Sequence, residues 1–151
     1  MQLQNSALRR SYFDSDGDTL SKLSTEELIG SLVSRSGSVG DTQRHAWSEQ
    51  HRLLRPLAAN LSSAHFFWEF QIPRTGKRAD VIVYLGGRLL VLEFKVGAEN
   101  FDSASKAQVL DYALDLKNFH SGSHQLSILP VLICTKAPSD EFQTDSYPDG
   151  I

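Results

Sequence analysis

The residues of this chain best suited to chemistry lie in one stretch, RADVIVYLGGRLLVLEFK, at positions 78–95. The stretch predicts two apolar strands joined by the glycine pair at 86–87, because glycine readily adopts the positive φ that a two-residue hairpin turn requires. Asp80 and Glu93 stand near the outer ends of the two strands, and Lys95 follows two residues after Glu93. Two acids and a lysine in this arrangement could bind a cation.

Pairing outward from the turn places Asp80 opposite Glu93, and side chains that alternate with period two place Lys95 on the same face. Opposed carboxylates repel each other, and partial burial would raise a pKa or demand a counter-charge. Lys95 supplies one positive charge and a divalent cation would supply the rest, since Mg²⁺ is commonly held by one or two carboxylates, water and phosphate. A surface ion pair at a strand end, with Asp80 and Lys95 solvated, is the alternative interpretation.

The composition is that of a single globular domain in a reducing compartment. The chain has 151 residues, of which 40% are hydrophobic and 22% charged, and its one cysteine, Cys134, cannot form an internal disulfide. No window approaches the ~18 apolar residues that a membrane span needs, so we expect a cytoplasmic protein without membrane contact. A net charge of −3 argues against coating nucleic acid by bulk charge, yet leaves local phosphate contacts open.

The N-terminal part of the chain predicts helices that precede the hairpin. Residues 1–41 are expected to form an extension that is irregular as far as position 23 and then contains a short helix, which Ser24 can cap. Asp41 or Thr42 can cap a second helix, which should end near position 61. Pro56 predicts a kink or a break in that helix, because proline cannot donate the hydrogen bond of the helix interior.

The remaining elements predict an α/β fold around a mixed sheet. Strands are expected at 65–72, 79–85 and 88–96, a helix at 103–119, a buried strand at 126–135 and a polar tail at 139–151. Helix, three strands, helix and strand in this order favour a sheet with helices packed on it.

Asp80 and the later run Glu93-Phe94-Lys95, which ends an apolar strand, resemble the motif of the PD-(D/E)xK nuclease superfamily. Ala79 departs from the pattern, because proline is commonest at that position. The resemblance implies a three-layer, restriction-endonuclease-like core (αβββαβ) with a mixed central β-sheet flanked by helices.

Further residues support the resemblance over residues 42–138. Gln108 and Tyr112 lie four apart on a predicted helix, so they share a face, and their spacing resembles an additional motif of the RecB-like branch. Glu49 stands where many members carry an acidic residue on the first helix. More narrowly, the chain is similar to the nuclease-like region that precedes a Schlafen-type DNA/RNA helicase-like ATPase in bacterial proteins. That likeness implies an ATPase partner, in cis or in trans.

The resemblance implies roles for the acids and the lysine. Asp80, Glu93, the carbonyl of Phe94 and Glu49 would be ligands of Mg²⁺ (or Mn²⁺), which offsets phosphate charge and lowers the pKa of a bound water. Lys95 would orient that water or stabilise the transition state. In the alternative interpretation, Lys95 only neutralises the acidic pair and Glu49 is a solvated helix residue.

The same resemblance gives other residues a supporting role. Gln108 and Tyr112 would hold the surroundings of the metal site or the DNA backbone, although Tyr112 could instead pack on the sheet. Arg74, Lys77 and Arg78 would contact phosphates, unless they form a charged loop that is simply solvated.

These expectations favour a metal-dependent nuclease that hydrolyses phosphodiester bonds, in DNA rather than in RNA, with a link to defence against phage. The first alternative is a catalytically inactive module that binds nucleic acid or a partner for a helicase-like ATPase. The second is a scaffold whose hairpin face is covered in a homo-oligomer.

Overall fold

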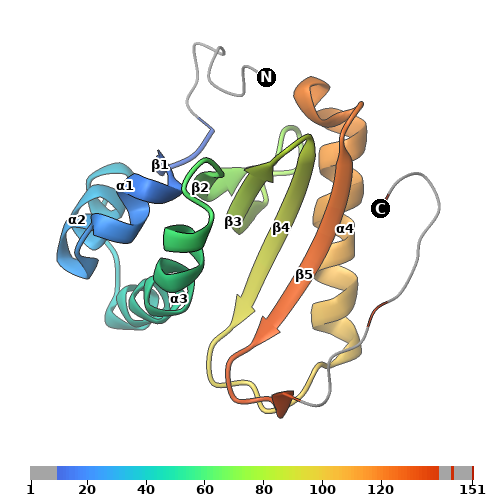
Figure 1. Cartoon of the computed structure of the whole chain (residues 1–151). Coiled ribbons are helices and arrows are strands. Elements are labelled where there is room, and N and C mark those ends of the chain that lie inside the picture. The colour runs from blue at the N-terminus through green and yellow to red at the C-terminus, as the bar shows by residue number, and fades with distance from the viewer. Residues whose placement is uncertain (1–9, 140–143, 145–150) are drawn as a thin grey trace.

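The computed structural model describes residues 10–139, 144 and 151, and in them a five-stranded mixed sheet lies between two layers of helices (Figure 1). The elements are β1 (Phe13–Asp16), α1 (Gly17–Lys22), α2 (Thr25–Ser36), α3 (Asp41–Asn60), β2 (His65–Gln71), β3 (Arg78–Leu85), β4 (Arg88–Lys95), α4 (Ser103–Phe119), the 3₁₀ turn η1 (Ser121–Ser123) and β5 (Ser127–Cys134). The predicted mixed α/β fold is therefore confirmed, while most of the predicted tail at 139–151 lies outside the described residues.

The sheet follows the order of the chain, β1-β2-β3-β4-β5. Neighbouring strands are antiparallel except β4 and β5, which are parallel because α4 carries the chain back across the sheet. The hairpin between β3 and β4 turns at Gly86 and Gly87, whose φ angles are 55° and 81°. Leu85 pairs with Arg88 across this turn, so the register predicted for the hairpin is confirmed.

The two faces of the sheet bury two separate hydrophobic cores. Helices α1, α2 and α3 cover one face and α4 covers the other, as the blue-to-green and orange helices of Figure 1 show. The core on the α3 side contains, among others, Leu20, Leu28, Trp47, Leu54, Trp68, Val81 and Phe94. The core on the α4 side contains, among others, Phe67, Phe70, Ile82, Val91, Val109 and Leu116. Both helical layers are thereby held against the strands that carry the acids.

The prediction of an irregular chain up to position 23 is wrong for residues 13–22, which form β1 and α1. Strand β1 exists because it pairs with β2, in the register that sets Phe13 against Trp68. Helix α1 follows at once, because the side chain of Asp16 caps it by accepting the N–H of Thr19 at 2.7 Å. Elements of four and six residues are too short to show a periodic pattern in the sequence. Their formation depends instead on strand pairing and on helix capping.

The predicted cap of α2 is confirmed as a capping box, in which Ser24 and Glu27 each accept the other's backbone N–H. Helix α3 differs from its prediction in two ways. Its N-cap is Gly40 rather than Asp41 or Thr42, and it runs unbroken through Pro56 to Asn60. The helix tolerates Pro56 because that turn is exposed, where water can bind the carbonyl that loses its partner.

Replacing Gly17 by alanine should destabilise the fold by about 2 kcal/mol, because overpacking against rigid atoms costs about 1–3 kcal/mol. A Cβ atom there would overlap the carbonyl oxygen of Leu61 and lie 2.7 Å from that of Ala58. The matched control is Gly30→Ala in the exposed middle of α2, where a Cβ atom meets nothing within 4 Å. That control should gain about 0.5–1 kcal/mol from helix propensity. Urea unfolding of both variants measures the difference, and equal stabilities would contradict the prediction.

Candidate active site

Asp80 lies where the ladder between β3 and β4 ends. The last pair of that ladder is Val81 with Leu92, and one further step in the same register sets Asp80 opposite Glu93. At that step the Oδ2 atom of Asp80 accepts the backbone N–H of Phe94 at 2.8 Å. The carboxylate of Asp80 thus accepts a hydrogen bond from a backbone amide of β4, so this side chain is turned toward β4.

Glu93 and Lys95 are joined to α4 by a chain of hydrogen bonds. The Nζ atom of Lys95 lies 3.3 Å from Oε1 of Glu93 and 2.7 Å from Oε1 of Gln108. The Nε2 atom of Gln108 then donates to the hydroxyl oxygen of Tyr112 at 2.7 Å. Four of the residues predicted from the sequence therefore form one network, because the spacing of four on α4 points both of its side chains at the end of β4.

The two hairpin acids are held in a poorly solvated place. Burial, followed by the charge of Asp80, raises the pKa of Glu93 to about 7 although Lys95 opposes the change. Burial raises the pKa of Asp80 to about 6, against the N–H of Phe94 and the charge of Lys95. Glu93 is only 6% exposed. Repulsion and burial therefore act on this pair as expected for opposed carboxylates, and the site has a deficit of positive charge.

A third acid, Glu69 on β2, joins this group and was missed by the sequence reasoning. The Trp47 side chain of α3 donates its Nε1–H to Oε1 of Glu69 at 2.9 Å. Burial and the charge of Asp80 raise the pKa of Glu69 to about 7, and this carboxylate in turn raises the pKa of Glu93. The sequence did contain one signal: Glu69 is the single acid in the aromatic run HFFWEFQ. A strand buried only for stability would carry an apolar residue at that position.

Glu49 is not brought to these acids by an interaction of its own. It forms an ion pair with Arg52 at 2.9 Å, and the hydrogen bond from Arg52 lowers its pKa. Helix α3 reaches the acidic group through Trp47 instead, and residues two apart on a helix point to different sides. Glu49 is thus paired with Arg52, and its role as a metal ligand stays a prediction.

The basic residues of the loop before β3 have partners within the protein. Lys77 lies 3.4 Å from Asp115 of α4. The guanidinium of Arg78 stacks on the ring of Tyr12, 4.6 Å from the ring centre, and donates to the hydroxyl of Tyr12. Arg74 is exposed, with a φ of 67°. Within the part of the chain that the structure describes, Lys77 and Arg78 thus pair with Asp115 and Tyr12 rather than with the hairpin acids.

The donor set of the site suits a cation of the Mg²⁺ class only in part. Among the residues that the structure describes, no group of three or more His, Cys, Asp or Glu side chains is arranged to hold a metal ion. Mg²⁺, however, commonly uses one or two carboxylates and takes its other ligands from water and substrate. The Oε2 atom of Glu93 is buried and has no hydrogen-bond partner in the described part of the chain. Such an atom lacks the positive partner that a cation would provide. The two carboxylates of Asp80 and Glu93 therefore fit a cation of the Mg²⁺ class.

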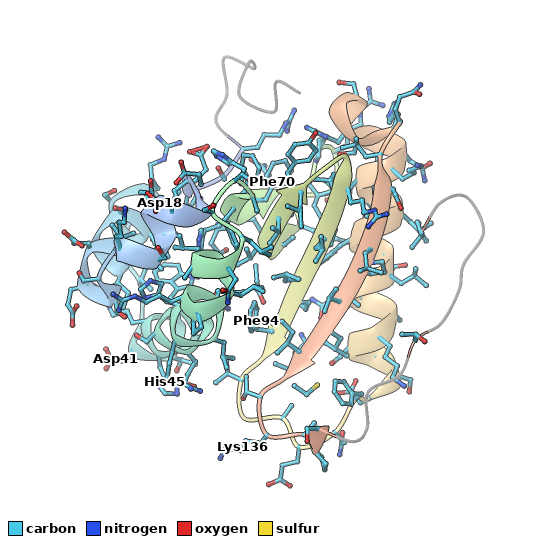
Figure 2. All side chains as sticks on the ribbon, in the orientation of Figure 1. Asp18, Asp41, His45, Phe70, Phe94 and Lys136 are labelled. Atoms are coloured by element: carbon cyan, nitrogen blue, oxygen red, sulfur yellow. The ribbon has the colours of Figure 1, made fainter. Side chains whose placement is uncertain are left out.

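Figure 2 shows the side chains on the ribbon, with Phe94 on the side of β4 that faces α3. Its neighbours in the sequence, Glu93 and Lys95, must point to the opposite face, where α4 lies. The catalytic candidates of β4 are therefore held from behind by the α3-side core and in front by Gln108 of α4.

Comparison with protein-family models, with curated proteins and with solved structures finds no match to this chain. None of the helices in residues 10–139 is both long and apolar enough to cross a membrane.

Proposed function

We propose that this protein is a Mg²⁺- or Mn²⁺-dependent nuclease that hydrolyses phosphodiester bonds, with DNA favoured over RNA. The observation that carries the proposal is the position of Lys95, which bridges Glu93 and Gln108 at the end of the hairpin where Asp80 and the buried Glu93 lie. Strongly perturbed carboxylates next to a fixed cationic side chain are characteristic of sites that handle charge during a reaction. Phosphate hydrolysis needs both kinds of group.

The order of the elements supports a restriction-endonuclease-like fold and membership of the PD-(D/E)xK superfamily. Helix α3, strands β2 to β4, helix α4 and strand β5 follow one another as αβββαβ. The acid of β3 and the acid and lysine of β4 stand at the same end of the hairpin, and α4 supplies the Gln108 and Tyr112 side chains. An N-terminal strand and two helices are added to this core.

The proposed chemistry assigns each side chain a task. Asp80 and Glu93 would hold the cation together with the carbonyl of Phe94, and the N–H of Phe94 keeps Asp80 turned toward β4. A divalent cation, when bound, offsets phosphate charge and lowers the pKa of a water molecule. Gln108, itself bonded to Tyr112, holds the ammonium of Lys95 in place. A positive charge held in advance is worth most where negative charge develops, here on the phosphorane-like transition state.

Contacts to the phosphate backbone are proposed for Arg74, Lys77 and Arg78. Arg74 is exposed, and the ion pair of Lys77 with Asp115 is on the surface. Surface pairs contribute roughly 0–1 kcal/mol, so a phosphate can replace Asp115 at little cost. The guanidinium of Arg78 stacks on Tyr12, so a planar cationic group lies at the first residue of β3.

The test is cleavage of supercoiled plasmid, single-stranded DNA and single-stranded RNA in the presence of Mg²⁺ or Mn²⁺. We expect Glu93→Gln and Asp80→Asn to lower the cleavage rate by at least about 100-fold, because each removes a charged ligand. The matched control is Asp111→Asn, which changes an exposed acid of α4 next to Tyr112 and should leave the rate unchanged. A wild-type protein that cleaves none of the substrates with either cation would refute the enzyme.

A second function is favoured by the sparse ligand set and by the net charge of −3. In that case the domain binds nucleic acid or a partner for a helicase-like ATPase and does not cleave. Calorimetric titration with Mn²⁺ separates the two functions, since the nuclease requires binding that disappears in Glu93→Gln. Nucleic-acid binding without any Mn²⁺ heat would support the inactive module.

A further inference from the structure

We propose that Glu69 and Trp47 act together as positioning residues, which turn Asp80 toward β4 and so complete the acidic site. The inference deepens the proposed function and rests on it for the consequence for metal binding. Its structural part, the control of the Asp80 side chain by a residue of β2, can be tested without any metal.

The first observation is the backbone of Glu69. Its φ is 53°, in the left-handed region that side chains other than glycine rarely adopt. Such a conformation is strained, and it persists only where surrounding contacts enforce it. The contact that enforces it here is the hydrogen bond from the Nε1–H of Trp47, a side chain that is 1% exposed.

The second observation is a break in the alternation of both strands at the same step. In an undisturbed strand, residues two apart pack on the same face. The residues on either side of Glu69 and of Asp80 instead pack in different cores. Trp68 and Val81 lie in the α3-side core, whereas Phe70 and Ala79 lie in the α4-side core. The pairs Trp68–Val81 and Phe70–Ala79 are also the ladder pairs on either side of this step, so Glu69 and Asp80 share the break.

The break explains the unusual orientation of Asp80. A regular β3 would direct this side chain away from the sheet, and the backbone of β3 would accept the amides of β4. Asp80 instead lies in reach of the backbone N–H of Phe94 and accepts it at 2.8 Å. The sequence of causes runs from Trp47, through the left-handed Glu69, to the shared break and then to the carboxylate of Asp80.

A third observation links Glu69 to the acids themselves. Glu93 has a buried Oε2 atom without a hydrogen-bond partner in the described residues. That atom shows where the site lacks positive charge, and the Glu69 carboxylate adds to the negative potential there. Glu69 is therefore placed to act on the affinity for a cation through the orientation of the Asp80 side chain.

The experiment uses the full chain and three variants. Glu69→Gln keeps an oxygen that can accept from Trp47, Glu69→Gly adopts the left-handed conformation freely but has no side chain to be held, and Trp47→Phe removes the N–H donor. The matched control is Trp68→Phe, since Trp68 is equally buried and its Nε1 has no partner among the described residues. Both Trp→Phe changes leave a similar cavity in the same core, so only the lost hydrogen bond differs.

The first measurement is the amide signal of Phe94 in ¹H–¹⁵N spectra and its hydrogen exchange, with Asp80→Ala as the reference for a lost hydrogen bond. In Glu69→Gly and Trp47→Phe, the amide should shift toward its position in Asp80→Ala and exchange about tenfold faster, as expected for the loss of one hydrogen bond. In Glu69→Gln and Trp68→Phe it should stay near the wild type. An unchanged Phe94 amide in Glu69→Gly and Trp47→Phe overturns the inference.

The second measurement is the affinity for Mn²⁺. Positioning predicts about tenfold weaker binding in Glu69→Gly and Trp47→Phe, and near wild-type binding in Glu69→Gln. If Glu69→Gln loses binding while Trp47→Phe keeps it, Glu69 is a direct ligand and the positioning role is wrong. If the wild type binds no Mn²⁺ but the Phe94 amide responds as described, the metal-dependent function fails and the positioning of Asp80 stands.

Discussion

Lys95→Met is expected to lower the rate of cation-dependent cleavage by about two to three orders of magnitude, the loss typical of removing one fixed group that stabilises developing charge. Lys95 is held between Glu93 at 3.3 Å and Gln108 at 2.7 Å, so its ammonium needs little reorganisation during the reaction. Methionine keeps the length and the apolar stem of the side chain, which limits the change to the charge and its hydrogen bonds.

The matched control for this variant is Lys22→Met. Lys22 also pairs with an acid, Asp18 at 2.9 Å, but its side chain is 74% exposed on α1. The rate of that control should equal the wild-type rate within a factor of about two, because exposed ion pairs contribute little. Single-turnover cleavage with saturating Mn²⁺ separates the chemical step from weaker binding of the cation. If Lys95→Met cleaves at the wild-type rate under these conditions, Lys95 only neutralises the acids.

Stability should fall as the pH rises when no cation is present, and Glu93→Gln should remove part of that dependence. The folded pKa of Glu93 is about 7 against an ordinary value of 4.5. Between these two values the unfolded chain has released a proton that the folded chain keeps, so a higher pH favours unfolding in this window. This difference between the folded and the ordinary pKa corresponds to roughly 3–4 kcal/mol, at about 1.4 kcal/mol for each pH unit. Asp80 and Glu69, whose pKa values are also raised, act in the same direction.

Two histidines, His51, which is buried, and His120, which is partly buried, oppose this trend and must be separated from it. Burial lowers the pKa of His51 and of His120, so their contribution to stability increases with pH until the ordinary value of 6.5 is reached. The difference in unfolding free energy between Glu93→Gln and the wild type cancels that contribution, because both proteins contain the histidines. Urea unfolding between pH 5 and pH 8 should show the variant gaining roughly 2–3 kcal/mol relative to the wild type. A difference that does not change with pH would contradict the raised pKa of Glu93.

Addition of Mn²⁺ gives an independent readout of the same charge deficit. A ligand that binds only the folded protein stabilises it, by an amount that grows with its concentration relative to the dissociation constant. We expect Mn²⁺ to raise the wild-type Tm more at pH 8 than at pH 5, because protons compete for Asp80 and Glu93 at the lower pH. Glu93→Gln should show little change at either pH.

The acids of this sheet lie where burial of their charge works against the stability of the fold. Three carboxylates on three adjacent strands have raised pKa values, and one lysine lies among them. A sheet selected only for stability would place apolar residues at these positions, as it does at their neighbours. Conflicts of this kind between sequence and fold are typical of functional sites.

The sequence by itself determined the hairpin and its register, and it placed Gln108 and Tyr112 on one face of α4. These are local matters, because a two-residue glycine turn sets which residues face each other, and a spacing of four sets which residues share a helix face. Asp80, Glu93 and Lys95 could therefore be grouped before any coordinates were known, and the resemblance to the nuclease superfamily added Gln108 and Tyr112 to them. The restriction-endonuclease-like assignment stays a prediction.

Only the tertiary structure decided which other residues reach the acids. Glu69 precedes Asp80 by eleven positions in an aromatic strand, and it joins the site through the pairing of β2 with β3 and a left-handed backbone. Neither the hydrophobic pattern nor the composition of β2 reveals that conformation, because a hydrogen bond from Trp47 of α3 enforces it. Likewise, the side of α3 that meets the sheet was set by packing, which turned Trp47 inward and left Glu49 with Arg52. Local rules specify neighbours along the chain, whereas contacts between distant segments depend on how whole elements pack.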